Sequence, residues 1–388
     1  MKKKILVLLA VVVIVTLFTT TLGVRIADWI LNPVTEHEPF KISEEAAALH
    51  ASLIVGDWHA DTALWNRNMQ GRHDVGHVDL ARMQEGNLGI QMFTTVTKSP
   101  LGQNYESNKT STIDKITVLA LAQMWPAATW SSLTERALYQ AAKIRELAQK
   151  RPYDFALILT KSDLADWQMA RETNHDFAAG LIGTEGSHAL HANLDNIDVL
   201  YDAGFRMMSL QHFFDNALGG SLHGTSKAGL TAFGKQAVEI MQAKDIIVDV
   251  SHSSEATVRD VLAQSTAPLV ISHTGFKGHC DTPRNIADEL MLQIAEAGGL
   301  IAVGFWPGAV CGSSPESVIE AIEYGVALVG EDHVALGSDF DGTVETSFDA
   351  SEMAVLTQTM LDRNMPESAI RKVMGGNMVR FLSENLPD

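Results

Sequence analysis

The sequence predicts an α/β protein built as a (β/α)8 TIM barrel, with an N-terminal membrane anchor helix in front of it. Strand-like and helix-like segments alternate beyond residue 50, as expected for βα units around a parallel sheet. Histidine and carboxylate side chains end most of the strand-like segments, and a barrel of this class collects its chemistry at those ends. One long apolar run near the N-terminus predicts the anchor.

Eight short apolar runs account for the barrel strands. They are residues 53–61, 89–97, 181–188, 205–212, 246–254, 268–274, 299–307 and 334–342. Helical periodicity is found over residues 132–149, 256–263, 289–297 and 315–329. The section 98–176 is predicted to be mostly helical, with an extra strand outside the barrel within residues 155–164.

The N-terminal segment has the features of a membrane anchor. Three lysines at positions 2–4 precede an apolar run over residues 5–24, and about 20 such residues can span a bilayer as a helix. A cleaved signal peptide is the alternative, although residues 19–24 lack the small-residue pattern of a cleavage site. The lysines favour a cytoplasmic N-terminus.

These features predict three parts of the chain. Residues 1–24 are expected to form a transmembrane signal anchor or a signal peptide, and 25–48 a tether in which Pro33 and Pro39 interrupt any continuous helix. Residues 49–388 are expected to form a single barrel domain. The predicted orientation places this domain outside the cytoplasm, in a periplasmic or extracellular location, attached to the membrane through residues 5–24.

Composition excludes some classes of function. The 388 residues are 46% hydrophobic, which is enough apolar content for a large buried core. The formal net charge is −18, and no cluster of lysine and arginine is available to neutralise phosphates. We therefore expect no nucleic-acid partner.

Five residues at strand ends form a plausible set of metal ligands. His59 and Asp61 are two residues apart, so an extended strand end directs both to the same side. His252 and His273 end successive strands, and the two carboxylate oxygens of Glu185 can bridge two ions. This mixed nitrogen and oxygen set suits zinc, although cobalt, manganese or iron would also be admitted. Open positions would hold water, whose pKa zinc can lower to about 7.

Each residue also has a structural alternative when it is considered alone. Glu185 could cap a turn, Asp61 could be the N-cap of a helix, and Asp339 or Asp341 could form an Asx-turn before Gly342. Buried ionised carboxylates cost several kcal/mol or more unless they are paired or bound to a metal. A shared metal site therefore explains the whole set better than separate structural roles do.

At these segments the chain resembles the membrane dipeptidase family, also called renal dipeptidases, within the amidohydrolase-like barrels. The resemblance extends from about residue 50 to the C-terminus. The family has His-x-Asp after the first strand, a Glu-Gly pair after the third, and single histidine ligands after the fifth and sixth. The matching residues are His59 with Asp61, Glu185 with Gly186, His252 and His273.

The resemblance also implies which residues contact substrate. The substrate-contacting histidine of the family matches His212 in LQHFFDNALGG, and its carboxylate-binding arginine matches Arg284 in PRNIAD. Its acidic residue in an Asp-Phe-Asp-Gly motif matches Asp339. Trp58 departs from the family, which commonly has glycine there, so the resemblance leaves the shape of the pocket and its side-chain preference open. Other binuclear barrels often use His-x-His and a modified lysine on the fourth strand, but residues 205–212 contain no lysine.

The function implied by the resemblance is a zinc metallodipeptidase of the metal-dependent hydrolase type. Two zinc ions per chain would hold a bridging hydroxide that attacks the peptide carbonyl. Arg284 would pair with the free carboxylate of a dipeptide, and His212 would hydrogen-bond the developing oxyanion. Asp339 would move the proton from water to the leaving amine. Dipeptides with a C-terminal D-residue are included among the expected substrates.

Further expectations concern covalent and quaternary structure. Cys280 and Cys311 occupy positions that are bridged in renal members of the family, so the resemblance implies a disulfide outside the cytoplasm. Two unpaired thiols are the alternative. Dimers are common in the family, which makes a homodimer an expectation here too.

Two other functions remain open from the sequence. The first is another binuclear metallohydrolase on the same barrel, such as a lactonase or an N-acyl amino acid deacylase, which would make little use of Arg284. The second is a non-catalytic envelope binding protein. Such a protein would be expected to have lost metal ligands, and no ligand of the family pattern is missing from this sequence.

Overall fold

The computed structural model describes residues 22–388 and contains the predicted barrel. Nine parallel strands follow one another in the order β2-β1-β9-β8-β7-β6-β5-β4-β3, and pairing of β2 with β4 closes eight of them into a ring. Strand β3 pairs with β4 outside this ring. Both the (β/α)8 fold and the extra strand predicted within residues 155–164 are therefore confirmed.

The strands are short and almost completely buried. Their bounds are β1 (Val55–Ala60), β2 (Leu88–Val96), β3 (Phe155–Leu157), β4 (Ala178–Glu185), β5 (Phe205–Ser209), β6 (Ile247–Asp249), β7 (Val270–Thr274), β8 (Leu300–Val303) and β9 (Val334–Leu336). Every residue of the eight barrel strands is buried. Helices cover the outer face and side chains fill the inside, so these strands are apolar runs rather than alternating patterns.

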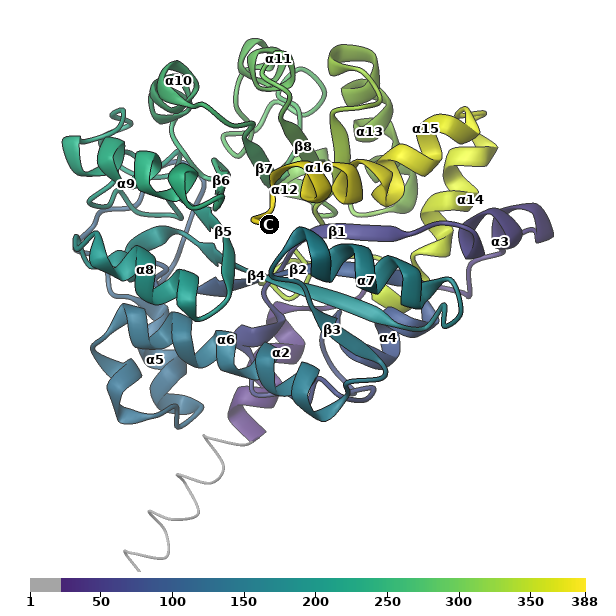
Figure 1. Cartoon of the computed structure of the whole chain (residues 1–388), viewed down its shortest axis with the longest axis horizontal. Helices are drawn as coiled ribbons and strands as arrows, with labels where there is room; N and C mark the ends of the chain where they lie inside the picture. The colour runs from purple at the N-terminus through teal and green to yellow at the C-terminus, as the bar shows by residue number, and fades with distance from the viewer. Residues whose placement is uncertain (1–21) are drawn as a thin grey trace, which may run out of the picture.

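The α-helices of residues 22–388 cover the barrel, and most of them form an outer layer around it (Figure 1). They are α2 (Val24–Leu31), α3 (Glu44–Ala51), α4 (Leu80–Glu85), α5 (Lys115–Ala122), α6 (Leu133–Lys150), α7 (Lys161–Arg171), α8 (Asp195–Asp202), α9 (Ala232–Ala243), α10 (Glu255–Gln264), α11 (Asp288–Glu296), α12 (Pro307–Val310), α13 (Pro315–Val329), α14 (Ala354–Asp362), α15 (Glu367–Arg371) and α16 (Asn377–Asn385). The first turns carry the expected caps: Ser132 caps α6, and Thr160 with Asp163 forms a capping box on α7.

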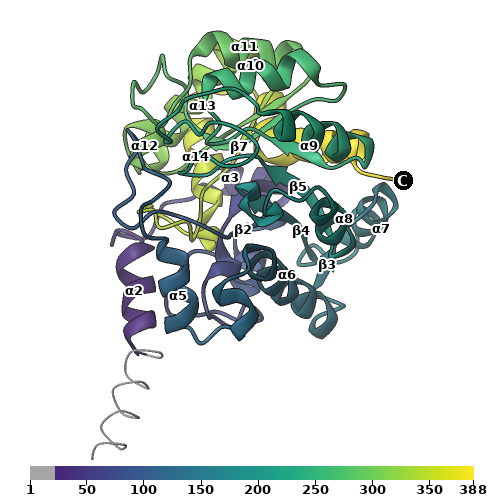
Figure 2. The same ribbon diagram turned by 90° about the vertical axis from the view of Figure 1, so that its left-hand side faces the viewer.

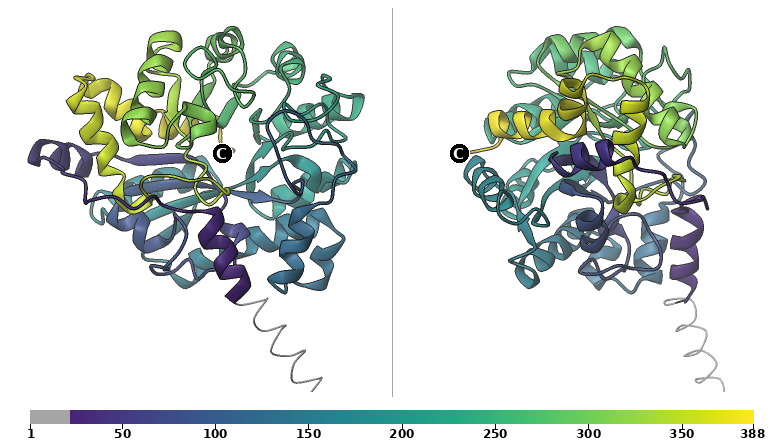
Figure 3. Two further views of the ribbon diagram at one scale, coloured as in Figure 1. Left: turned by 180° about the vertical axis from the view of Figure 1, so that it is seen from behind. Right: turned by 90° about the vertical axis from the view of Figure 1, so that its right-hand side faces the viewer.

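Helix α16 and helix α2 lie at opposite ends of the barrel (Figure 2; Figure 3, right). Met378 and Phe381 of α16 pack in one apolar cluster with Trp58 and other residues inside the barrel. The departure from the family at Trp58 therefore lies away from the predicted site. Its indole fills the barrel interior against α16 and lines none of the cavities at the predicted site.

The predicted anchor falls largely on residues 1–21, outside the described part of the chain. Among residues 22–388, no helix combines the length and apolar character needed to cross a bilayer. The segment 25–48, expected to be a tether, contains most of α2 and the start of α3. It is packed on the barrel: Asp28 of α2 forms an ion pair with Arg67, and the Asn32 side chain accepts a hydrogen bond from the backbone of Thr343.

Candidate metal centre and substrate cleft

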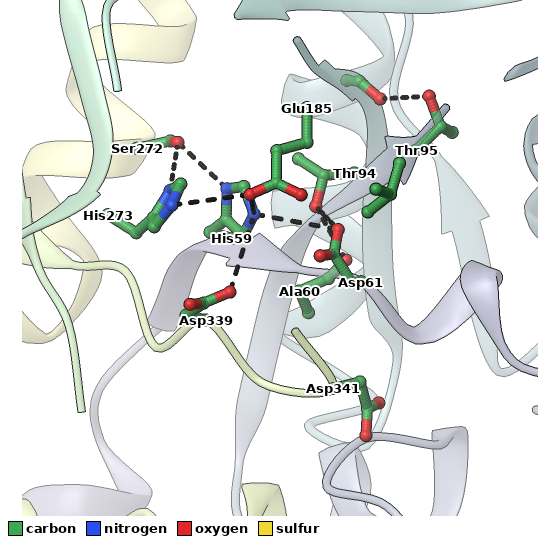
Figure 4. Close-up of polar contacts among 12 residues, drawn as sticks. His59, Ala60, Asp61, Thr94, Thr95, Glu185, Ser272, His273, Asp339 and Asp341 are labelled. Atoms are coloured by element: carbon green, nitrogen blue, oxygen red, sulfur yellow. Dashed lines mark hydrogen bonds and ion pairs between the residues drawn. The ribbon is translucent and has the colours of Figure 1, made fainter. Parts of the chain in front are cut away.

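The fold brings the predicted metal-site residues together at the C-terminal ends of the strands (Figure 4). His59 lies in β1, Glu185 is the last residue of β4, and His273 lies in β7. His252 and Asp339 follow β6 and β9 by three residues each. The side chains converge because parallel strands of a closed barrel all end on the same face.

Glu185 lies at the centre of this group. Its Oε1 atom is 3.2 Å from Nε2 of His212, 3.3 Å from that of His252, 3.6 Å from that of His59 and 3.7 Å from that of His273. Ligands about 2.0–2.2 Å from one tetrahedral ion lie roughly 3.3–3.6 Å from one another. The spacing around Glu185 therefore matches that of atoms sharing cations.

Hydrogen bonds orient two of the histidines as ligands. The hydroxyl of Ser272 donates to Asp249 Oδ2 at 2.7 Å, so its oxygen is left to accept. The Nδ1 atoms of His59 and His273 both lie 3.0 Å from that oxygen, and we assign the ring protons to them. Each Nε2 then presents a lone pair toward Glu185. The buried Nε2 of His59 has no hydrogen-bond partner.

His252 adds a third imidazole to this cluster. Its Nε2 lies 2.8 Å from Nε2 of His273. The backbone of His252 has φ +60°, in the left-handed region that few non-glycine residues adopt. Such strain persists only where surrounding structure holds it, and it is concentrated at functional sites.

Two groups of converging ligand atoms can be distinguished in the described part of the chain. The first comprises His59, Glu185, His273 and Asp339, and the second comprises Glu185, His212 and His252. Glu185 belongs to both groups, as expected of a carboxylate that bridges two ions. Nitrogen and carboxylate oxygen ligands in sets of three and four fit zinc.

The structure places Asp61 and Asp339 differently from the roles expected of them as metal ligand and proton carrier. Asp61, a predicted ligand, accepts a hydrogen bond from Thr94 and lies 3.8 Å from Nε2 of His59, but it belongs to neither group. Asp339, predicted to carry a proton, lies 4.0 Å from that same nitrogen and belongs to the first group. Both aspartates therefore face the centre from the β1 and β9 side.

The electrostatics of the centre are those of a cation site. Burial and the nearby Glu185 carboxylate raise the pKa of Asp61 well above its ordinary value. Burial also raises the pKa of Asp339 to about 8, against the influence of His59. Burial lowers the pKa of His59, but the surrounding carboxylates outweigh it and raise the pKa to about 9, so a cation that binds Nε2 would displace a proton from it. Three carboxyl groups share one buried space, and bound cations would relieve their repulsion.

The imidazoles of His252 and His273 remain neutral, and neutral imidazole is the form in which histidine binds metals. Burial and the positive charge of Arg284 lower the pKa of His252 well below its ordinary value. Burial and the neighbouring His59 do the same for His273.

The backbone conformation after Glu185 explains why a glycine follows it. Gly186 has φ +77°, and a Cβ atom there would lie 2.8 Å from Cβ of His212. Only glycine fits this turn without displacing the histidine. Gly186 therefore allows Glu185 and His212 to approach each other.

A second turn positions Asp339. Asp339 and Asp341 have φ values of +61° and +65°. Asp341 is fully buried; it pairs with Arg67 at 2.8 Å and accepts hydrogen bonds from Thr62 Oγ1 and the backbone N–H of His77, both at 2.7 Å. These contacts hold the strained turn that directs Asp339 toward the centre.

Arg284 reaches the centre from the connection after β7. It is buried, its Nη2 donates to the carbonyl of His273 at 2.8 Å, and its Nε has no hydrogen-bond partner. A small cavity lined by Arg284, Glu185, His212 and Asp339 lies beside it. A positively charged donor thus faces the cavity next to the candidate metal centre.

The predicted disulfide is confirmed. Cys280 and Cys311 are bonded, with their Cα atoms 5.6 Å apart. The bond joins the connection after β7, which carries Arg284, to α12 after β8.

Sequence analysis missed several residues that support the site. Ser272 and Asp249 orient the histidines, while Tyr105 and Trp306 line the cavity and are joined by a hydrogen bond from Trp306 Nε1. The sequence did place Ser272 directly before a predicted ligand. Nothing in the sequence indicated Tyr105, because it lies in a long connection far from any strand end.

Comparisons with known proteins agree with this architecture. A model of the membrane dipeptidase family, peptidase family M19, matches residues 43–386. Dipeptidase ataJ of Aspergillus terreus is 27% identical over 339 residues, covering 80% of this chain and 77% of that protein. Dipeptidase verJ of Clonostachys rogersoniana is 28% identical over 315 residues, covering 79% and 76%.

Solved structures share the fold. A metallopeptidase from Rhodobacter sphaeroides, liganded with a phosphinate mimic of the dipeptide L-Ala-D-Ala, has a TM-score of 0.69 and 23% identity, covering 86% of this chain and 99% of that one. The probable dipeptidase PvdM from Pseudomonas aeruginosa has a TM-score of 0.73 and 20% identity, covering 88% and 98%.

Proposed function

The chain belongs to the membrane dipeptidase family, and on that premise we propose that it hydrolyses dipeptides at a centre of two zinc ions. The observation that supports this most directly is the convergence of four imidazole nitrogens on one oxygen of Glu185. Glu185 would contribute to both ion sites, because it belongs to both groups of ligand atoms. The other ligands are His59, Asp61, His252 and His273.

Bound zinc would supply Lewis acidity for the peptide carbonyl and a water molecule acidified to a pKa of about 7. The protein contributes the orientation of its ligands. Ser272 fixes the ring protons of His59 and His273 on Nδ1, and partners of this kind typically affect metal affinity by about 10- to 100-fold.

Arg284 selects the substrate in this proposal. A guanidinium matches the planar carboxylate of a dipeptide C-terminus, and burial beside Trp306 excludes the water that would weaken the pair. The distance from this group to the scissile bond sets the length of peptide that fits.

Two residues act during the reaction. His212 donates from Nδ1 to the carbonyl of Lys98 and turns Nε2 toward Glu185, so the protonated ring would also donate from Nε2 to the oxygen that gains charge. Asp339 accepts the proton of the attacking water and delivers it to the leaving amine. Its position in the buried turn after β9 and its raised pKa suit a group that both accepts and donates a proton.

The test is hydrolysis of matched L-Ala-L-Ala and L-Ala-D-Ala by the purified full chain, with metal content measured on the same sample. We expect cleavage of dipeptides, about two zinc ions per chain, loss of activity with a chelator, and recovery with zinc. Cleavage of the L-D dipeptide would extend the substrates to C-terminal D-residues.

N-acetyl-alanine and a simple lactone serve as contrasting substrates in the same assay. Two bound metals with turnover of either compound, but of no dipeptide, would contradict the proposal and favour another binuclear hydrolase. A chain that binds no metal and cleaves nothing would contradict the metal centre as well.

We also propose that residues 1–24 attach the protein to a membrane, with the catalytic domain outside the cytoplasm. The lysines at positions 2–4, the apolar run and the disulfide support this location. A homodimer remains a proposal based on the family. Protease accessibility in intact cells and light scattering of the purified protein test these two points.

A further inference from the structure

Helix α2 has an inverted distribution of polar and apolar residues. Its buried side presents Asp28, and Asn32 just beyond its end is also buried. Its exposed side presents Ile26, Trp29 and Ile30, with 64% of Trp29 accessible to solvent. A water-facing helix on a globular protein normally has the opposite arrangement.

The segment 116–130 buries Ile116, Ala120 and Trp125 in an apolar cluster and still exposes further apolar residues to solvent. Its exposed residues are all apolar: Val118, Leu121, Met124, Pro126, Ala127, Ala128 and Trp130. Two of its polar residues are buried, where Gln123 donates to the carbonyl of Leu64 and Thr129 donates to that of Pro126. No residue in the segment carries a charge.

These two segments form one surface, which we call the outer apolar face. Figure 2 shows α2 beside α5, and one cavity of about 620 Å³ is lined by residues of both helices. Of the fifteen large hydrophobic residues that are exposed in the described chain, five lie in residues 22–31 and six in residues 101–130. Nine of the fifteen thus belong to α2 with its flanking residue Leu22 or to the segment 116–130, and Leu101 lines the same cavity, which exceeds the scattered exposure of ordinary surfaces.

We propose that the outer apolar face rests in the interfacial layer of a phospholipid bilayer. The apolar run of residues 5–24 leads directly into α2, so any bilayer that holds this run lies next to the face. Trp29 and Trp130 are exposed on it, and tryptophan is enriched where protein meets the headgroup layer.

The chemistry of the face favours lipid over other occupants. Arg25 is the one exposed charge of α2, and it pairs with Asp74. The whole chain carries a net charge of −18, which would repel an anionic surface. Attachment therefore depends on burial of apolar side chains, and zwitterionic lipid is the matching surface.

The docked orientation places the substrate cleft close to the membrane. The cavity between α2 and α5 shares Leu64, Gln103, Lys115 and Thr343 with a smaller cavity that reaches Glu185 and His212. The cavity at the catalytic centre therefore adjoins the cavity of the outer apolar face.

The test uses the full chain reconstituted into phosphatidylcholine nanodiscs. The two native cysteines are bonded to each other, so a single cysteine introduced by Leu121→Cys can be labelled with a fluorophore without a competing thiol. Leu292→Cys on α11 is the matched control, since Figures 1 and 2 place α11 at the opposite edge from α2. Emission is compared between ordinary and dibrominated phosphatidylcholine.

An interfacial side chain enters about 5–10 Å into the bilayer, so we expect brominated lipid to quench the label at position 121 by about two-fold or more. The label at position 292 is expected to remain unchanged. Equal emission of the 121 label in both lipids would overturn the proposal. Protection of that label from aqueous iodide without bromine quenching would also overturn it, because a second copy or another protein would then cover the face.

A charge variant separates docking from simple tethering by the N-terminus. In the Leu121→Cys background, Val118→Asp with Met124→Asp is expected to abolish the quenching. Aspartates at exposed Met169 and Val199 are the matched control and should leave it intact. If quenching were unchanged in the first variant, the N-terminal segment alone would be holding the label near the bilayer. That result would contradict a docking role for the outer apolar face.

Discussion

At the scale of single residues, Glu185 depends on its neighbours to remain charged. Burial alone would raise its pKa, but the imidazoles of His212, His252 and His59 outweigh that cost and hold the pKa well below its ordinary range. The sequence identified this glutamate from its position after an apolar run and before Gly186. It could not indicate that one oxygen would face all four rings, because the rings come from four different strand ends.

Asp339 is predicted to act as the general base and general acid of the reaction. Asparagine has the same shape and tolerates the left-handed backbone at this position, so Asp339→Asn should preserve the turn. We expect kcat to fall by about 10²- to 10⁴-fold, as for loss of a general acid and base. The measurement is steady-state hydrolysis of L-Ala-L-Ala together with metal content.

The metal content decides between two roles of Asp339, since its oxygen lies 4.0 Å from Nε2 of His59. Retained zinc with lost turnover would support proton transfer. Loss of one zinc along with activity would make Asp339 a ligand and contradict the assigned role.

Arg284 is predicted to recognise the free carboxylate. Hydrogen bonds to charged groups contribute about 1.5–3 kcal/mol, so Arg284→Met should lower kcat/KM for a dipeptide by roughly 10- to 100-fold. The same variant should change kcat/KM for the corresponding dipeptide amide very little, because that substrate lacks the negative charge. Arg259→Met, on the exposed surface of α10, is the control for loss of an arginine. An equal loss for acid and amide would refute carboxylate recognition.

At the scale of elements, strong periodicity located the helices well. Helix α13 begins and ends at the predicted residues 315 and 329, and α6 and α10 differ from prediction by one residue at each end. The strands were located, and β2 and β4 have the predicted length, but β6 and β9 end early because the chain after them turns sharply at His252 and Asp339. Helix α2 was missed, since its buried polar and exposed apolar residues do not follow the usual pattern.

The Cys280–Cys311 disulfide joins two catalytic-face connections at a sequence separation of 31 residues. A loop of this size predicts a contribution of about 3–4 kcal/mol to the free energy of unfolding. We therefore expect Cys280→Ser with Cys311→Ser to lower Tm by roughly 4 °C in calorimetry. The variant should also raise KM, because Arg284 lies in one of the joined connections. A Tm within about 1 °C of the native protein would show that packing alone holds these connections.

At the scale of the whole molecule, metal binding is predicted to stabilise the barrel. The ligands come from β1, β4, β6 and β7, so bound ions link distant parts of the ring. A ligand at 100 times its Kd adds about 2.7 kcal/mol of stability per site. Removal of both ions should therefore lower Tm by about 5 °C or more, measured by calorimetry with and without a chelator.

Zinc added after chelation should restore the original Tm, while magnesium at the same concentration should not, because imidazole nitrogens do not suit it. A Tm that chelation leaves unchanged would argue against ions spanning these strands.

The sequence by itself determined the barrel, the family and the identity of the residues at the strand ends. These depend on local properties: the length of apolar runs, their alternation with helices, and the residue that follows each run. A histidine or carboxylate after a buried strand can be recognised from the sequence, because it is a polar residue at the end of an apolar run.

Only the tertiary structure decided how those residues meet. Closure through β2 and β4 sets which strand ends face one another, so it fixes the distances around Glu185 and the shared contact of two histidines with Ser272. It also decided that Trp58 packs inside the barrel and that α2 lies beside α5. These relations join residues far apart in the chain, and local periodicity carries no information about them.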